Sequence, residues 1–295
     1  MTPQDLLLMV FCLIDDPMKA LVLTRLRSRG PRQTTLADSE VITIERVGEV
    51  WGLGDDQALD VSFRRSPAAE FPSLTRVHRT TFARQAANLC WAKRRLQRSW
   101  AGWLPHPREP WLVDSRPRPV CRFARARTCR RFAGQASWGF DPVAVKAFYG
   151  FRLHLRTSPD GVILAYQLAP ADAAETEVIG EVVPTPPGVG LGDRNSWSPA
   201  LQAAFQAVGG GLVAPFKTAR YDPDPRRSHG LLKLRRRIEH AIGQLVERFD
   251  CRRIRIREIW HLEHRLVRKI LSHTVAIWLN VREGHEPLQF DRLVA

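Results

Sequence analysis

Short apolar runs alternate with longer amphipathic segments between residues 111 and 281, and this alternation limits the fold more than any other feature of the sequence. Short apolar runs bounded by turn residues predict buried strands, whereas apolar residues that recur every three or four positions predict helices. In this chain the order is three strands, a helix, a strand, a helix, a strand and a long helix. Such an order predicts a mixed α/β sheet with flanking helices.

Individual segments supply this order. The run Trp111–Val113 predicts the first strand, and the runs 148–156 and 162–168 predict an antiparallel hairpin around the turn-forming sequence at 158–161. The remaining elements are predicted as helices at 174–183, 198–209, 231–249 and 261–281, as strands at 189–191 and 212–214, and as a short alternating run at 254–256.

The first hundred residues have a helical pattern. Apolar residues between Leu6 and Ile14 fall on one helical face, and a second helix is predicted to begin with an N-cap near Asp38. Basic residues, Lys93 among them, surround an apolar seam in segment 76–96, which is as typical of a helix-turn-helix on DNA as of an ordinary basic helix surface. Prolines break the pattern in the segment 100–110, which predicts a linker. We therefore predict a helical DNA-binding module at 1–104, an α/β domain at 111–282 and a C-terminal tail at 283–295.

The chain carries 45 Lys and Arg against 30 Asp and Glu, a formal net charge of +15. A positive excess of this size predicts a polyanionic partner, with nucleic acid ahead of an acidic membrane surface. The five cysteines are odd in number and never form a Cys-x-x-Cys pair, which argues against a disulfide framework and against structural zinc. The apolar stretch near the N-terminus is too short to span a membrane, so we expect a cytoplasmic chain.

Three carboxylates stand at positions where a catalytic site can form. Asp114 and Asp193 each follow an apolar run that predicts a buried strand, and Glu239 lies at the margin of the apolar face of the long helix. Converging carboxylates repel one another, and oxygen-only ligands select Mg²⁺ or Mn²⁺. Two such ions suit phosphoryl transfer on a nucleic acid. Each residue alone also has an ordinary explanation, because strand-end Asp residues cap turns and a helical Glu beside arginines forms ion pairs.

A set of segments spread over nearly the whole chain carries a family resemblance. They are Phe11–Asp16, Leu36–Val41, Asp114–Pro117, Cys121–Arg127, Phe148–His154, Leu168–Ala171, Leu191–Asp193, Arg235–Glu239, Gln244–Leu245 and Arg248–Phe249. In this order they resemble the DDE-type transposases of bacterial insertion sequences, and most closely insertion-sequence family 982.

The resemblance implies an RNase H-like mixed sheet with flanking helices, preceded by the helical module. It implies that Asp114, Asp193 and Glu239 are the catalytic residues and hold two Mg²⁺ or Mn²⁺ ions. It further implies double-stranded DNA substrates, namely the terminal inverted repeats of the insertion sequence and target DNA. We expect a homodimer, because two ends are handled together, and association with the bacterial nucleoid.

The chain departs from this family at Arg194–Ser196, where relatives tend to carry Lys-Gly-Tyr, and at Val246, where they tend to carry lysine. Two alternatives to an active transposase therefore stay open. One is an RNase H-like nuclease that is not a transposase, and the other is a catalytically inactive DNA-binding relic.

Seven arginines stand between residues 116 and 131, with Phe123 and Phe132 interleaved. This density predicts a segment that grips the DNA backbone. The predicted DNA-binding residues are Arg122, Arg125, Arg127, Arg130, Arg152 and Arg235. Arg235 stands one helical turn before Glu239, so it is equally suited to a phosphate contact and to pairing with the glutamate. His261 and His264 are predicted to be surface residues.

Overall fold

The computed structural model of the chain describes residues 2–20, 34–65, 70–184, 188–215, 220, 224–251, 256 and 258–293. Contacts divide the chain into two compact units. Unit 1 comprises Met1–Trp100, Glu247–Cys251 and Glu263–Ala295, and unit 2 comprises Ala101–Val246 and Arg252–Leu262. These units are defined by contacts, whereas the predicted boundaries at 104, 111 and 282 are those of independently folding domains. The domain boundaries therefore stay a prediction.

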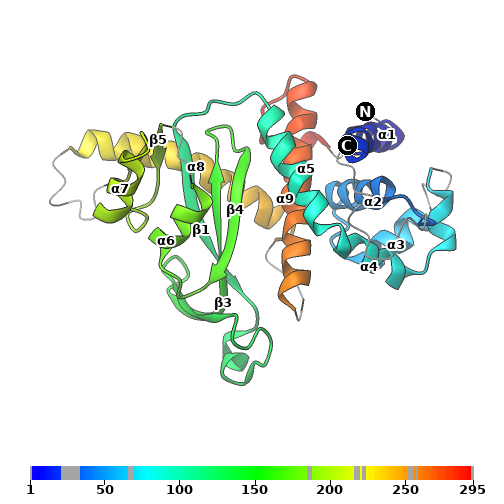
Figure 1. The fold of residues 1–295 in the computed structure, drawn as a ribbon, viewed down its shortest axis with the longest axis horizontal. Coiled ribbons are helices and arrows are strands. Elements are labelled where there is room, and N and C mark those ends of the chain that lie inside the picture. Colours follow the sequence, from blue (N-terminus) through cyan, green and yellow to red (C-terminus); the bar gives the residue numbers. More distant parts are fainter. Residues whose placement is uncertain are drawn as a thin grey trace. The chain divides into compact units, whose positions relative to one another are not determined.

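Unit 1 is helical in the part of the chain that is described (Figure 1). Its elements are α1 (Pro3–Ala20), α2 (Asp38–Val50), α3 (Asp56–Arg65), α4 (Arg79–Asn88), most of α5 (Cys90–Trp103), most of α9 (Ile259–Arg282) and the 3-10 turns η2 (Pro72–Arg76) and η5 (Phe290–Leu293). Helix α2 is the centre of this unit, because every residue from Val41 to Val50 is buried. Apolar side chains of α1, α3, α4 and α9 complete the core around it.

A network of buried charges runs through the same core. Glu45 of α2 is fully buried and pairs with Lys93 of α5. Glu49, one turn further along α2, accepts a hydrogen bond from Arg268 of α9 at 2.5 Å. His264 of α9 is 2% exposed, and its Nδ1 lies 3.2 Å from the Lys93 ammonium. The predicted surface position of His264 is therefore wrong, and Lys93 lies in the core and not on a basic helix surface, since the buried carboxylate of Glu45 contacts both.

The predicted start of α2 near Asp38 is confirmed: its N-cap is Ala37, and the side chain of Glu40 reaches back to accept a hydrogen bond from the Ala37 N–H at 2.6 Å. One local prediction for the helical part needs correction. The predicted linker at 100–110 begins too early, because α5 continues to Trp103 and buries Trp100. The alternating run at 254–256 lies outside the described residues except for Ile256.

Unit 2 contains a six-stranded mixed sheet with helices against it. Its elements are β1 (Trp111–Pro119), η3 (Phe123–Thr128), β2 (Ser137–Asp141), β3 (Lys146–Thr157), β4 (Ile163–Pro170), α6 (Glu175–Val182), β5 (Val189–Leu191), α7 (Pro199–Gln206), β6 (Gly211–Val213) and α8 (Pro225–Glu247). Strand β3 pairs antiparallel with β1, β2 and β4, whereas β1, β5 and β6 are parallel neighbours. The predicted mixed α/β sheet with flanking helices is confirmed.

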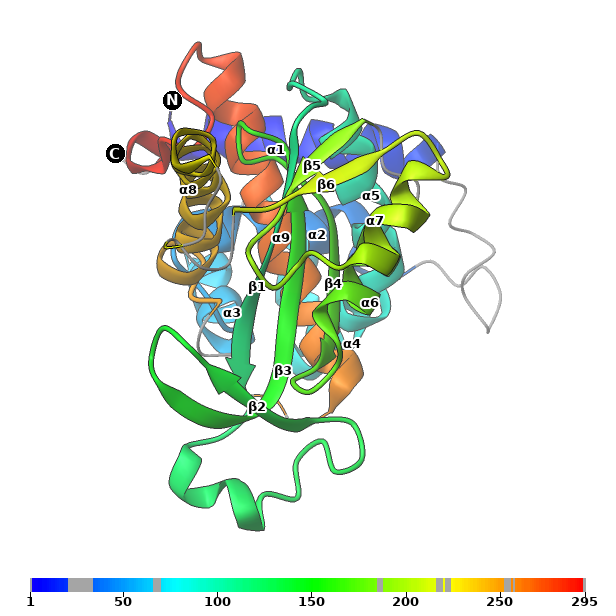
Figure 2. The same ribbon diagram turned by 90° about the vertical axis from the view of Figure 1, so that its left-hand side faces the viewer.

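Helices cover the sheet on both faces, as Figure 2 shows, with α6 and α7 on one side and α8 on the other. The core on the α6–α7 side is built on Trp111, whose ring meets that of Phe205 edge to face at 5.9 Å. Val178 and Ile179 of α6 add to this core. The sheet therefore holds β1 between two helical layers.

The structure corrects two strand predictions. Strand β1 does not end at Asp114 but continues to Pro119, because its residues pair with β3 from Leu112 opposite Thr157 to Pro119 opposite Gly150. This ladder overrides the weak local strand preference of a segment rich in arginine and proline. Strand β2 was absent from the predicted order, since Ser137–Asp141 is short and contains a glycine. Among the described residues no helix combines the length and the apolar content that crossing a membrane requires.

Candidate active site

Asp114 lies within β1, in register with Leu155 of β3. Its side chain is 15% exposed, and its Oδ1 accepts a hydrogen bond from the Ser115 N–H at 2.9 Å. Burial raises the pKa of Asp114, the Arg235 guanidinium opposes that rise, and the negative charge of Asp193 adds to it. Asp193 is thus one of the charges that act on the Asp114 carboxyl.

Asp193 follows β5 and reaches the level of Asp114 because β5 runs parallel to β1, with Leu191 beside Leu112. Its Oδ1 accepts hydrogen bonds from the N–H groups of Asn195 at 2.8 Å and Ser196 at 2.6 Å. The aspartate therefore caps the turn that follows the strand, and Oδ2 is the oxygen through which it can bind a cation.

Glu239 lies on α8, and its side chain is 55% exposed. Arg235, one turn earlier on the same helix, places its Nη2 at 3.2 Å from Asp114 Oδ2 and at 3.6 Å from Glu239 Oε1. The guanidinium thus joins the strand aspartate to the helix glutamate. Of the two roles considered for Arg235, the structure shows the pairing with the glutamate, and the phosphate contact stays a prediction.

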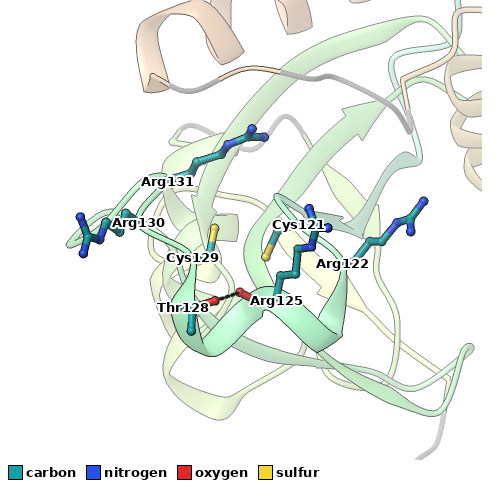
Figure 3. A pocket seen from close by; sticks show the side chains of 7 residues that line it. All are labelled: Cys121, Arg122, Arg125, Thr128, Cys129, Arg130 and Arg131. Atoms are coloured by element: carbon teal, nitrogen blue, oxygen red, sulfur yellow. Dashed lines mark hydrogen bonds between the residues drawn. The ribbon is translucent and has the colours of Figure 1, made fainter.

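The arginine-rich connection between β1 and β2 forms an open hollow of about 950 Å³ (Figure 3). Its lining residues are Cys121, Arg122, Arg125, Thr128, Cys129, Arg130 and Arg131. Three of the predicted DNA-binding residues line this hollow, and Arg127 is exposed on the same segment. The five cysteines are all free thiols.

Arg152 of β3 lies apart from that hollow and is half-buried. It donates to the carbonyl oxygen of Phe140 at 2.5 Å and to the Ser115 hydroxyl at 3.4 Å, and it lies over the ring of Phe148. These contacts tie β2 and β1 to β3. A DNA contact by Arg152 stays a prediction.

Residues 108–265 match the family model described as a transposase DDE domain, and the match covers more than half of the chain. The chain belongs to the DDE transposase domain family. No curated protein and no solved structure gives a match. The matched region of the DDE domain contains β1, β5 and α8, and therefore all three predicted catalytic carboxylates. The DDE-type part of the resemblance is thereby confirmed.

The DDE domain offers carboxylate oxygens, which are the ligands that Mg²⁺ and Mn²⁺ prefer. Among the described residues, however, no three His, Cys, Asp or Glu side chains are close enough together to hold a metal ion. Asp114 and Asp193 are coupled, while Arg235 stands between Asp114 and Glu239 with its positive charge. The residue types fit a divalent cation, and Arg235 occupies the position of a counter-ion between two of them.

Glu175, the first residue of α6, is a carboxylate of the DDE domain that the sequence prediction missed. Burial raises its pKa to about 7, and the charges of Asp193 and Asp114 contribute to the rise. The Ser115 hydroxyl hydrogen-bonds to it and Arg152 lies near, and both oppose the rise. An acidic residue at the start of a helix that follows a strand was the available signal, but acidic residues are common in first helical turns for other reasons. Glu175 is thus a further, largely buried carboxylate of the DDE domain whose ionisation the charges of the two aspartates influence.

Proposed function

We propose that this chain is an insertion-sequence transposase that cuts DNA at the ends of its element and joins the freed 3′-hydroxyl groups to target DNA. The observation that carries the proposal is that Asp114 lies on β1 and Asp193 directly follows the parallel neighbour β5 in a DDE domain whose helix α8 carries Glu239. A basic chain with a net charge of +15 suits this substrate. Membership of insertion-sequence family 982 and an RNase H-like fold are parts of the same proposal.

Asp114, Asp193 and Glu239 would hold two Mg²⁺ or Mn²⁺ ions. Bound there, such ions would lower the pKa of the attacking water or 3′-hydroxyl and neutralise the leaving oxygen. Asp193 keeps its Oδ1 in the turn and offers Oδ2, so its orientation is fixed before a cation binds. Arg235 neutralises Asp114 and Glu239 in the absence of a cation. A cation that took its place would free Arg235 to turn towards a phosphate.

The arginines of the β1–β2 connection would neutralise backbone phosphates without reading the base sequence. Arg122, Arg125 and Arg130 line one hollow, so their positive charges lie on one part of the surface. Two copies of the chain would act together, since both ends of an element are cut and joined in one reaction.

The test incubates the purified chain with Mg²⁺ and linear DNA that carries the flanks of its own gene, and products are mapped at nucleotide resolution. The variant is Asp193→Asn, and the matched control is Asp172→Asn, an exposed aspartate in the loop after β4. We expect cuts at the element ends in the wild type and in Asp172→Asn and none in Asp193→Asn. Cuts without preference for the ends would indicate a nuclease, and DNA binding without any cut would indicate an inactive relic.

A further inference from the structure

Two large aromatic rings of unit 2 lie at the surface in contact with each other. Phe123 is 61% exposed and Trp138 is 44% exposed, and their ring centroids are 6.0 Å apart at an interplanar angle of 81°. Trp138 in turn lies 5.6 Å from the ring of Tyr149. Single exposed apolar residues need no explanation, but adjoining exposed rings from η3 and β2 form a surface. We call Phe123, Trp138 and Tyr149 the aromatic cluster.

The sheet fixes the aromatic cluster from below. Trp138 pairs across β2 and β3 with Tyr149, whose side chain is half-buried. The Tyr149 hydroxyl lies 3.5 Å from the carbonyl oxygen of Phe132, which is buried and packs edge to face on Phe151 at 5.4 Å. Two rings are therefore exposed on a support that is part of the core. A binding surface held in this way loses little side-chain entropy when a ligand stacks on it.

The surroundings of the aromatic cluster are positively charged. Phe123 stands directly after Arg122 and two residues before Arg125, and both arginines line the hollow in Figure 3. No acidic residue occurs between Asp114 and Asp141 in the sequence. The ligand that fits is thus an anion with flat apolar faces. Nucleic acid has this chemistry only where a base is unpaired, because bases inside a duplex stack on each other.

We propose that the aromatic cluster stacks an unpaired DNA base while the arginines of the β1–β2 connection neutralise the adjoining phosphates. The inference rests on DNA being the substrate of the proposed function, but it does not require cleavage. In this proposal the exposed rings bind single-stranded DNA at or beside a cut end.

The test measures binding in EDTA, so that cleavage plays no part. One probe is a single-stranded oligonucleotide, another is the same sequence as a blunt duplex, and a third is a duplex with an unpaired overhang that carries 2-aminopurine. The variants are Phe123→Ala and Trp138→Ala, and Trp103→Ala removes an even more exposed tryptophan as a control, since Trp103 on α5 is 64% exposed. Trp138→Phe, which keeps a ring, accompanies Trp138→Ala, and thermal unfolding monitors folding of every variant.

We expect Phe123→Ala and Trp138→Ala each to weaken single-strand binding by roughly 5- to 100-fold, the range that loss of one stacked base gives, and to leave duplex binding within about two-fold. Trp138→Phe and Trp103→Ala should bind like the wild type, and 2-aminopurine fluorescence should be quenched only when the ring at 138 is present. The inference would be overturned if these variants lost equal affinity for single-stranded and duplex DNA, or if their single-strand binding were unchanged. Preference of the chain for RNA over DNA would also overturn it. If the chain never cuts DNA but its variants show the expected losses of single-strand binding, the proposed transposase function is refuted while the proposed base-stacking site stands.

Discussion

Glu45→Gln is the substitution that tests the buried charge network of unit 1 most directly. Glu45 is fully buried and faces Lys93, with Arg46 at 3.3 Å and Arg268 at 3.7 Å. Burial alone would raise the pKa of Glu45, but these cations outweigh it and lower that pKa from 4.5 to about 2. The carboxylate is therefore the shared counter-ion of several cations that have no exposure to solvent.

The loss in the free energy of unfolding that Glu45→Gln should cause can be estimated in two independent ways. The difference between the two pKa values of Glu45 corresponds to roughly 3 kcal/mol of preference for the ionised form in the folded chain. Removing one partner of a buried ion pair costs about 3–5 kcal/mol, since the remaining charges stay buried without compensation. Glutamine keeps the volume of the side chain, so little of the effect comes from a cavity. We expect a loss of about 3–5 kcal/mol in the free energy of unfolding, or roughly 10 °C in Tm.

The assay is denaturant unfolding followed by tryptophan fluorescence, with Glu263→Gln as the control. Glu263 pairs with Arg94 at 2.9 Å, but its side chain is 39% exposed, so that substitution should cost less than about 1 kcal/mol. If Glu45→Gln stays within about 1 kcal/mol of the wild type, or no less stable than Glu263→Gln, the network does not stabilise unit 1 as argued.

Three further predictions follow from the structure. Burial and then the Lys93 charge lower the pKa of His264, so below pH 6.5 the unfolded chain binds more protons than the folded chain. As the pH falls below 6.5, the free energy of unfolding should therefore decrease by up to about 1.4 kcal/mol per pH unit. His264→Gln should flatten this dependence in unfolding curves measured from pH 7 to 5. Arg235→Gln should lower metal-free stability by about 1–2 kcal/mol and increase the gain in Tm on adding Mg²⁺, whereas the exposed Arg236→Gln should do neither. Glu175→Gln should raise the Mg²⁺ concentration for half-maximal cleavage roughly ten-fold, and the exposed Glu177→Gln should leave it unchanged.

Most of the sheet was predictable because its signals are local. The hairpin of β3 and β4 has a turn sequence between two apolar runs, and Asp193 follows a glycine-flanked apolar run that is short but unambiguous. Gly192 is also required there, since a Cβ on it would lie 2.6 Å from the Ser196 Cβ. These features depend on residues a few positions apart, so the sequence contains them directly.

The missed features depend on partners that are distant in the sequence. Lys93 looks like a surface lysine until a carboxylate 48 positions earlier is buried against it, and the second half of β1 becomes a strand only through its ladder with β3. Glu175 gains its environment from Ser115 and the two aspartates. Neither propensity nor periodicity contains such information, because both describe one segment at a time.

Arg235 links the electrostatics of the site to its proposed chemistry. Carboxylates that converge to bind cations repel one another when no cation is present, and a nearby guanidinium is one way to relieve that repulsion. Its contacts at 3.2 Å with Asp114 and 3.6 Å with Glu239 hold a strand residue and a helix residue together. A divalent cation that binds both carboxylates has to displace this arginine, so the energy of the ion pair opposes cation binding. DNA phosphate offers the displaced guanidinium a new partner, and cation binding should therefore be tighter in the presence of DNA than without it.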